Sequence, residues 1–165
     1  MKESNERLVL LPVDGSANSE RAFQWYLKNL RKENDRLAVV TVVESPVVPS
    51  SFIIMGPTVI SEEWQAEVEE SIERAKRTAE EFKVKCDKAQ LPCTILTETS
   101  DSGPGAKICQ IAKDRNASSV VMGSRGLNLI RRTLLGSVSS YVVNHSPVPV
   151  IVTPPDGGPR GTSNR

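Results

Sequence analysis

The residues best suited to holding a ligand lie in the glycine-containing segment 123–140. Its glycines are Gly123, Gly126 and Gly136, and Ser137 directly follows the third. Because glycine has no Cβ, the backbone at the first two positions can turn tightly and come close to a bulky anion. The third precedes an expected helix, and the unpaired amides at a helix start attract phosphate. The spacing therefore indicates a phosphate-binding loop.

Polar side chains in this segment can strengthen such a site. Hydroxyl donors are available from Ser137, Ser139 and Ser140, and positive charge from Arg125, Arg131 and Arg132. The competing interpretation is a glycine-rich turn that only joins a strand to a helix. From the residues alone, both interpretations stay open.

The elements that must position this segment alternate between strands and helices. Short apolar runs predict strands at 7–13, 36–43, 93–98, 119–122 and 148–152. Helical spacing of apolar residues predicts helices at 18–31, 62–88, 105–115 and 137–144. This alternation predicts a doubly wound, Rossmann-like α/β domain, in which helices cover both faces of a five-stranded parallel sheet. Ligands bind such sheets beyond the carboxyl ends of the strands.

The last predicted strand is expected at an edge of the sheet. Pro149 removes a backbone donor, which an edge strand tolerates better than a central one. Exposed edges tend to be paired or covered, so Val148, Val150 and Val152 predict a homodimer through this strand.

Three segments fall outside the alternating pattern. Residues 1–6 form a charged tail, and residues 44–62 form a variable loop with several prolines. Residues 154–165 show no apolar periodicity, so we expect disorder there. The predicted domain therefore spans residues 7–153.

Composition narrows the classes of partner and compartment. Among 165 residues, 21 basic and 20 acidic side chains leave a net charge of +1, which disfavours nucleic acid and anionic membranes as partners. Residues 1–7 are charged and polar and offer no apolar stretch suited to a signal peptide, and no apolar run is long enough to span a bilayer, so we expect a cytoplasmic protein. Three cysteines without a Cys-x-x-Cys motif are expected to be buried, reduced thiols.

Several catalytic motifs are absent or misplaced. The chain contains no G-x-x-x-x-G-K-[ST] loop. Gly103-Pro104-Gly105 has Ile108 where a dinucleotide fingerprint needs a third glycine, so a helix-start turn is favoured. The only histidine, His145, follows Ser137 by eight residues, at the far end of the expected helix. We therefore assign no catalytic residue.

The spacing G-x2-G-x9-G-[ST], followed by Val138 and Ser139, closely resembles the ATP-binding loop of the universal stress protein family. The segment LVLLPVDGSANSERAFQW resembles the family's opening strand and helix, and NHSPVPVIVTP its closing helix end and edge strand. The resemblance covers nearly all of residues 7–153 and implies the nucleotide-binding branch of the family.

The resemblance also implies a role for individual residues in binding ATP or another adenine nucleotide. Adenine would lie against Pro12, Val13 and the backbone of Val42. Asp14 would lie near the ribose, or near a Mg²⁺ or Mn²⁺ ion on the phosphates. The ribose and phosphates would meet Met122, Gly123, Arg125, Gly126, Gly136, Ser137, Val138 and Ser139.

These inferences favour an ATP-binding stress-response regulator whose bound nucleotide sets its conformation or partners. One alternative is a slow ATPase that uses the same pocket, where Asp14 is the only carboxylate that the sequence places nearby. The other is a nucleotide-free dimeric scaffold, in which the glycine segment is only a turn.

Overall fold

The computed structural model describes residues 6–44, 62–124 and 135–154, except for the side chain of Glu63. The strands are β1 (Arg7–Pro12), β2 (Asp35–Glu44), β3 (Cys93–Ser100), β4 (Ser119–Gly123) and β5 (Val150–Thr153). The helices are α1 (Ala17–Asn29), α3 (Glu62–Lys88), α4 (Pro104–Asp114) and α5 (Ser137–His145). Each strand and helix predicted from the sequence is present.

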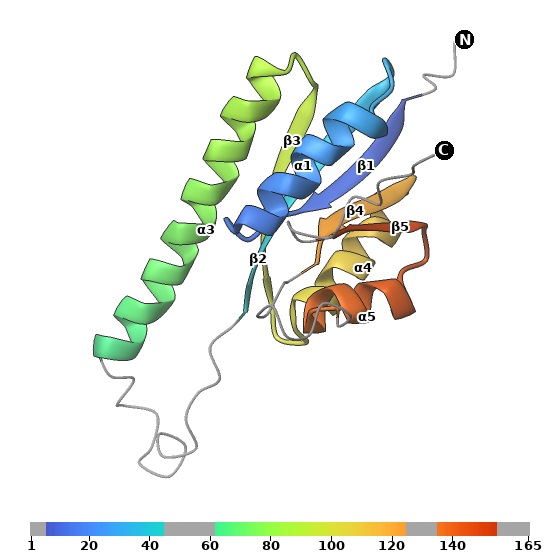
Figure 1. Ribbon diagram of the computed structural model, residues 1–165. Helices are drawn as coiled ribbons and strands as arrows, with labels where there is room; N and C mark the ends of the chain where they lie inside the picture. Colours follow the sequence, from blue (N-terminus) through green and yellow to red (C-terminus); the bar gives the residue numbers. More distant parts are fainter. Residues whose placement is uncertain (1–5, 45–61, 125–134, 155–165) are drawn as a thin grey trace, which may run out of the picture.

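The strands form one parallel sheet in the order β3-β2-β1-β4-β5, which confirms the predicted fold class (Figure 1). The chain first builds outward from β1 to β3. It then returns through α4 to the other side of β1, where β4 and β5 follow. The strand order therefore reverses between β1 and β4.

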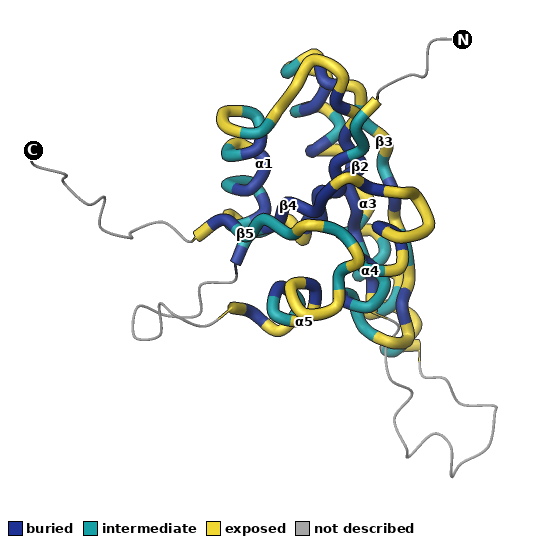
Figure 2. Tube along the Cα trace, turned by 90° about the vertical axis from the view of Figure 1, so that its right-hand side faces the viewer, coloured by how far each residue is buried: buried dark blue, intermediate teal, exposed yellow. Residues whose placement is uncertain are grey.

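Alternate residues of the central strands face opposite layers of helices, because successive strand side chains point to opposite faces. Val9 and Leu11 pack with residues of α1 and α3, including Phe23 and Phe82. Leu10 packs instead with residues of α4 and α5, including Ile111 and Val142. Figure 2 shows buried residues along the inner strands and exposed residues on the outer side of α5.

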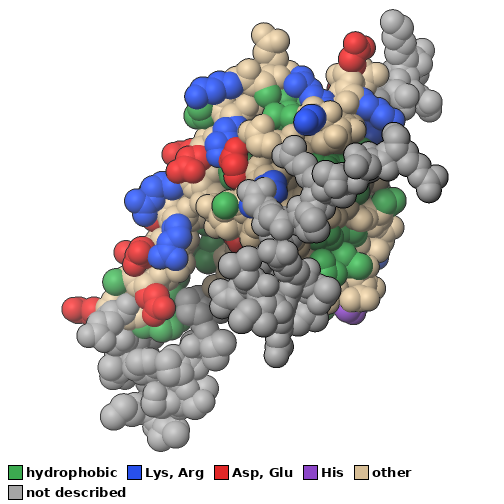
Figure 3. Space-filling model, in the orientation of Figure 1, with side chains coloured by type: hydrophobic (Ala, Val, Ile, Leu, Met, Phe, Trp, Pro, Cys, Tyr) green, Lys and Arg blue, Asp and Glu red, His purple; other side chains and the backbone are tan. Residues whose placement is uncertain are grey.

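The outer surface carries charges of both signs. Figure 3 shows Lys and Arg side chains interspersed with Asp and Glu along α3. This mixture agrees with the net charge of +1 and gives the visible face no extended field of one sign.

Strand β5 lies at an edge of the sheet, as predicted, but its start differs from the prediction. Val148 and Pro149 precede the strand, which begins at Val150. The carbonyl oxygen of Pro149 still accepts a hydrogen bond of 2.9 Å from the N–H of Val120. Pro149 therefore still accepts a hydrogen bond from β4. Because Pro149 precedes β5, its lack of an N–H removes no donor from that strand.

The three cysteines have free thiols, and Cys86 is buried as expected, whereas Cys93 and Cys109 are only partly buried. Burial, together with a hydrogen bond to Cys93, raises the pKa of the Cys86 thiol to about 12. Burial also raises the pKa of Cys109 above its ordinary value. Because the thiolate is the reactive form, these two thiols are poorly suited to redox chemistry at neutral pH.

None of the helices in the described part of the chain is long and apolar enough to cross a membrane.

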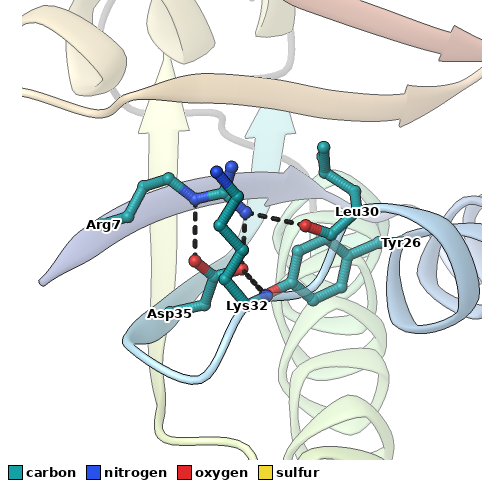
Figure 4. Close-up of polar contacts among 5 residues, drawn as sticks. All are labelled: Arg7, Tyr26, Leu30, Lys32 and Asp35. Carbon is teal, nitrogen blue, oxygen red and sulfur yellow. Dashed lines mark hydrogen bonds and ion pairs between the residues drawn. The ribbon is translucent and has the colours of Figure 1, made fainter.

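An ion pair with a fully buried carboxylate ties the amino-terminal ends of β1 and β2 together (Figure 4). Arg7 donates from Nε and Nη2 to the two carboxylate oxygens of Asp35, each at 2.7 Å. The Tyr26 hydroxyl and the backbone N–H of Lys32 also donate to Asp35, at 2.8 and 2.9 Å. The Asp35 side chain is fully buried, so these four hydrogen bonds replace its hydration.

The same contacts set the ionisation of Asp35. Burial by itself would raise the pKa of this carboxyl, but the hydrogen bonds from Arg7, Lys32 and Tyr26 and the charge of Arg7 outweigh it, so the pKa is lowered. The Tyr26 hydroxyl, buried beside the carboxylate, has a raised pKa. Asp35 is therefore charged and Tyr26 neutral at physiological pH.

We predict that Asp35→Ala lowers the free energy of unfolding by about 3–5 kcal/mol, because it leaves Arg7 without its buried partner. The lowered pKa of Asp35 adds stability that is complete above the unfolded-state value of about 3.9 and is lost as the pH falls below it. Urea unfolding between pH 7 and pH 3 should therefore show a steeper loss for the parent than for the variant. Parallel curves would contradict this role.

Candidate functional site

A pocket lies at the carboxyl end of the sheet, where the strand order reverses. Pro12 and Val13 contribute from β1 and its end, Val40 and Val42 from β2, and Met122 and Gly123 from β4. Its volume is about 640 Å³, including solvent at its mouth.

Three helices begin at this pocket. Asn18 and Ser19 line it from the first turn of α1, Pro104 and Ile108 from α4, and Val138 and Ser139 from α5. Each helix start carries backbone N–H groups without an intrahelical acceptor, and the helix dipole adds positive potential there. The pocket therefore favours an anionic group even though no Lys or Arg is among its described lining residues.

The start of α1 is organised by a short hydrogen-bond relay. Asp14 Oδ1 accepts from the backbone N–H and the hydroxyl of Ser16, at 3.1 and 2.6 Å. Ser16 is the N-cap and accepts from the N–H of Ser19 at 3.3 Å. One oxygen of the Asp14 carboxylate is therefore engaged in holding the first turn.

The start of α5 is organised around the carbonyl oxygen of Gly136. It accepts from the N–H of Ser140 at 2.8 Å and from the hydroxyl of Ser139 at 3.0 Å. Because the Ser139 proton is already donated, its backbone amide is better placed than its hydroxyl to meet an anion. Gly136 has φ −61° and ψ 161°, a conformation that any residue can adopt.

Gly123 has a packing reason for being glycine. A Cβ at this position would lie 2.4 Å from the backbone oxygen of Asn18 and 2.6 Å from its carbonyl carbon. The end of β4 therefore touches the first turn of α1 directly. The sequence interpretation, which gave Gly123 a role in approaching a ligand, did not include this contact.

The structure brings most of the predicted site residues together. Eight of them line the pocket: Pro12, Val13, Asp14, Val42, Met122, Gly123, Val138 and Ser139. Gly136 and Ser137 form the start of α5 without lining it. Arg125 and Gly126 lie outside the described residues.

Sequence reasoning missed the contributions of α1 and α4 to the pocket. Asn18, Ser16 and Ser19 follow the predicted first strand, so their position at the carboxyl edge was a usable signal. Gly103-Pro104 is indeed the start of a helix, with Gly103 at φ 88°. It lies near the pocket because α4 must cross from β3 back to β4. Strand order, which the sequence analysis left open, decides this placement.

His145 lies away from the pocket, as expected. It is in the last turn of α5, where its ring stacks on Tyr141 with centroids 4.1 Å apart. Its Nδ1 lies 2.8 Å from the carbonyl oxygen of Tyr141. The described residues contain no group of three or more His, Cys, Asp or Glu side chains able to hold a metal ion.

An open parallel sheet, with a pocket at the reversal of its strand order and helix starts around that pocket, defines a doubly wound α/β domain. The model of the universal stress protein family matches residues 6–154, and the chain belongs to this family. It is 32% identical over 153 residues to Universal stress protein MJ0531 of Methanocaldococcus jannaschii, covering 91% of this chain and 83% of that protein.

Solved structures show the same fold. A universal stress protein family protein from Arabidopsis thaliana with AMP bound has a TM-score of 0.61 and 23% identity, covering 88% of this chain and 90% of its own. A universal stress protein in complex with cAMP has a TM-score of 0.61 and 21% identity, covering 89% of this chain and 96% of its own.

We predict that Gly123→Ala lowers the free energy of unfolding of the ligand-free protein by about 1–3 kcal/mol. The new Cβ would force the backbone of Asn18 away from β4, and overpacking of a close contact has about this effect. Chemical denaturation in the absence of any nucleotide measures it. Unchanged stability would show that the contact between α1 and β4 can relax freely.

Proposed function

We propose that this chain is a regulatory protein of the universal stress protein family that binds ATP or another adenine nucleotide in the pocket. The observation that carries the proposal is the convergence of three helix starts on a pocket with an apolar wall. A nucleotide has the matching chemistry, since it joins an aromatic base to an anionic phosphate. The relatives solved with AMP and with cAMP bind ligands of this class.

The base would occupy the apolar part of the pocket. This part is lined by Val40 and Val42 of β2, Ile108 of α4, Met122 of β4 and Val138 of α5. Their apolar side chains can pack against the planar adenine ring from several sides. The backbone of Val42 and the edges of Pro12 and Val13 would then orient the adenine, as the family resemblance implies.

The phosphates would lie toward Gly123 and the start of α5. Backbone amides of Ser137, Val138 and Ser139 have no intrahelical acceptor and can donate to phosphate oxygens. Gly126 and Arg125, which are expected to take part, belong to the segment outside the described residues.

A divalent cation would have to be held mainly by the nucleotide itself. Asp14 is the one carboxylate among the described lining residues, and its Oδ1 already accepts from Ser16. A single carboxylate fits Mg²⁺ or Mn²⁺ carried on phosphates, with water completing the coordination. It does not fit a resident metal centre built from protein side chains.

Regulation is favoured over hydrolysis by the same arrangement. A positioned water needs a base, and the described lining offers only Asp14 for that role. His145 lies at the opposite end of α5 from the pocket. The slow ATPase therefore remains the alternative, and phosphate release by purified protein at several turnovers per second would favour it.

Binding of ATP should depend on the small size of Gly136. Gly136→Val is expected to abolish binding by pushing a side chain into the region of the amide-rich helix start, and Gly136→Ala to weaken it less. Ser137→Ala removes a hydroxyl but keeps the amides, so its loss should be about 0.5–1.5 kcal/mol, rising to about 3 for a charged acceptor. Isothermal titration calorimetry measures all three.

Circular dichroism provides the control for this series. Because Gly136 is buried, its replacement could disturb the fold, and a loss of binding is informative only if the variant is folded. The φ of −61° at Gly136 allows other residues, so a folded variant is expected. A folded Gly136→Val protein that binds ATP as tightly as the parent would support the nucleotide-free scaffold instead.

We also propose a homodimer through the edge of β5. Val150 and Val152 are half-buried against the core, and the outer edge of their strand is left without a neighbouring strand in the described sheet. Edges of this kind are commonly paired with a second chain. Val148 belongs to the turn before the strand and would flank the contact.

Val150→Lys is expected to shift the protein from dimer toward monomer in analytical ultracentrifugation, because it places a charge at the paired edge. Val84→Lys is the matched control, since Val84 lies on α3 and is 51% exposed. The control should remain dimeric. A parent protein that is monomeric at high concentration would contradict the proposal.

A further inference from the structure

We propose that Asn18 is a phosphate-binding residue of this pocket and that Arg21 positions it. The proposal rests on the nucleotide-binding function proposed above. Asn18 lies in the first turn of α1, is half-buried, and lines the pocket.

Arg21 fixes the orientation of the Asn18 amide. Its Nη1 donates a hydrogen bond of 2.8 Å to Oδ1 of Asn18 and lies 3.5 Å from the carbonyl oxygen of Pro154. A guanidinium group contains only donors, so the amide oxygen must face Arg21 and the NH₂ group must be turned the other way. The two N–H donors of Nδ2 are therefore the polar group that Asn18 can offer to a ligand.

Neighbouring polar side chains on this wall have their protons in use. The hydroxyl of Ser16 donates to Asp14, and the hydroxyl of Ser19 donates to the carbonyl oxygen of Ser16. By contrast, Nδ2 of Asn18 has no hydrogen-bond acceptor among the described residues. Asn18 is thus the side-chain donor still available on the α1 wall of the pocket.

The position of Asn18 matches the phosphate end of the ligand. Its backbone packs directly against Gly123, the first glycine of the segment expected to surround the phosphates. Its own backbone N–H lies in the first turn of α1 and has no intrahelical acceptor. The nearby charge of Arg21 polarises the amide and strengthens its donors toward an anion.

A purely structural role makes a different prediction. If Asn18 only served the first turn of α1, aspartate would replace it well, because a negative charge near a helix start is favourable and can pair with Arg21. Asn18→Asp should therefore keep or raise the melting temperature. If Asn18 instead binds phosphate, the same substitution replaces two N–H donors with a negative charge that repels the phosphate.

The test is calorimetric titration of the full chain with AMP, ATP and adenosine. Asn18→Ala should weaken binding of AMP or ATP about 10-fold, the effect of one hydrogen bond to a charged group, and Asn18→Asp about 100-fold or more. Binding of adenosine, which lacks phosphate, should change by less than about twofold in both variants. Asn34→Asp, an exposed site in the turn before β2, controls for the added charge.

Arg21→Met tests the positioning role. Alone it should weaken AMP or ATP about 3-fold, and in the Asn18→Ala background it should have no further effect, because the group that it positions is gone. Equal losses in both backgrounds would overturn the role of Arg21.

The outcomes separate this proposal from the one on which it rests. A parent that binds AMP or ATP while Asn18→Asp binds it equally well would overturn the role of Asn18 alone. Adenosine weakened as much as AMP would do the same, because the effect would not involve phosphate. A parent that binds neither nucleotide would contradict the proposed function and this assignment together.

Discussion

The structure depends on one constraint, the parallel pairing of all five strands. Parallel strands need crossover connections, so each helix must run back over the sheet and begin at the carboxyl edge. The starts of α1, α4 and α5 therefore collect at one end of the molecule, together with the ends of β1, β2 and β4. Backbone amides and helix dipoles accumulate there, while the described lining of the pocket contains no Lys or Arg, and the pocket follows from the topology.

The polar network around Asp35 and the candidate site lie at opposite ends of the sheet. At the amino-terminal edge, Arg7, Tyr26 and Asp35 form a network in which every carboxylate oxygen is hydrogen-bonded. At the carboxyl edge, the helix starts leave amides unpaired within their helices. The satisfied network ties β1, α1 and β2 together at the edge opposite the pocket.

The contact between Gly123 and Asn18 links packing to the pocket. Only a glycine lets β4 approach the first turn of α1 so closely, and that approach brings the Asn18 amide beside the glycine segment. Arg21, one turn further along α1, then holds the amide oxygen of Asn18, so that the NH₂ end of this side chain is the one turned away from Arg21. A single close approach of backbone thus serves both the fold and the proposed binding of phosphate, which explains why the two roles are hard to separate by sequence alone.

The sequence by itself determined the elements, because apolar periodicity and branched runs are local signals. It predicted α3 at its observed bounds and β5 at an edge of the sheet, and eight of the residues that it assigned to the site line the pocket. It misjudged where β5 begins, since a Val-Pro-Val run reads as continuous strand although Pro149 lies outside it. Only the tertiary structure decided that β4 pairs with β1 on the side away from β2, so that α4 crosses over the sheet there and carries Ile108 into the pocket, because strand order is set by long-range pairing. The same holds for the buried ion pair of Arg7 and Asp35, which lie 28 residues apart in the chain and meet only because β1 pairs with β2.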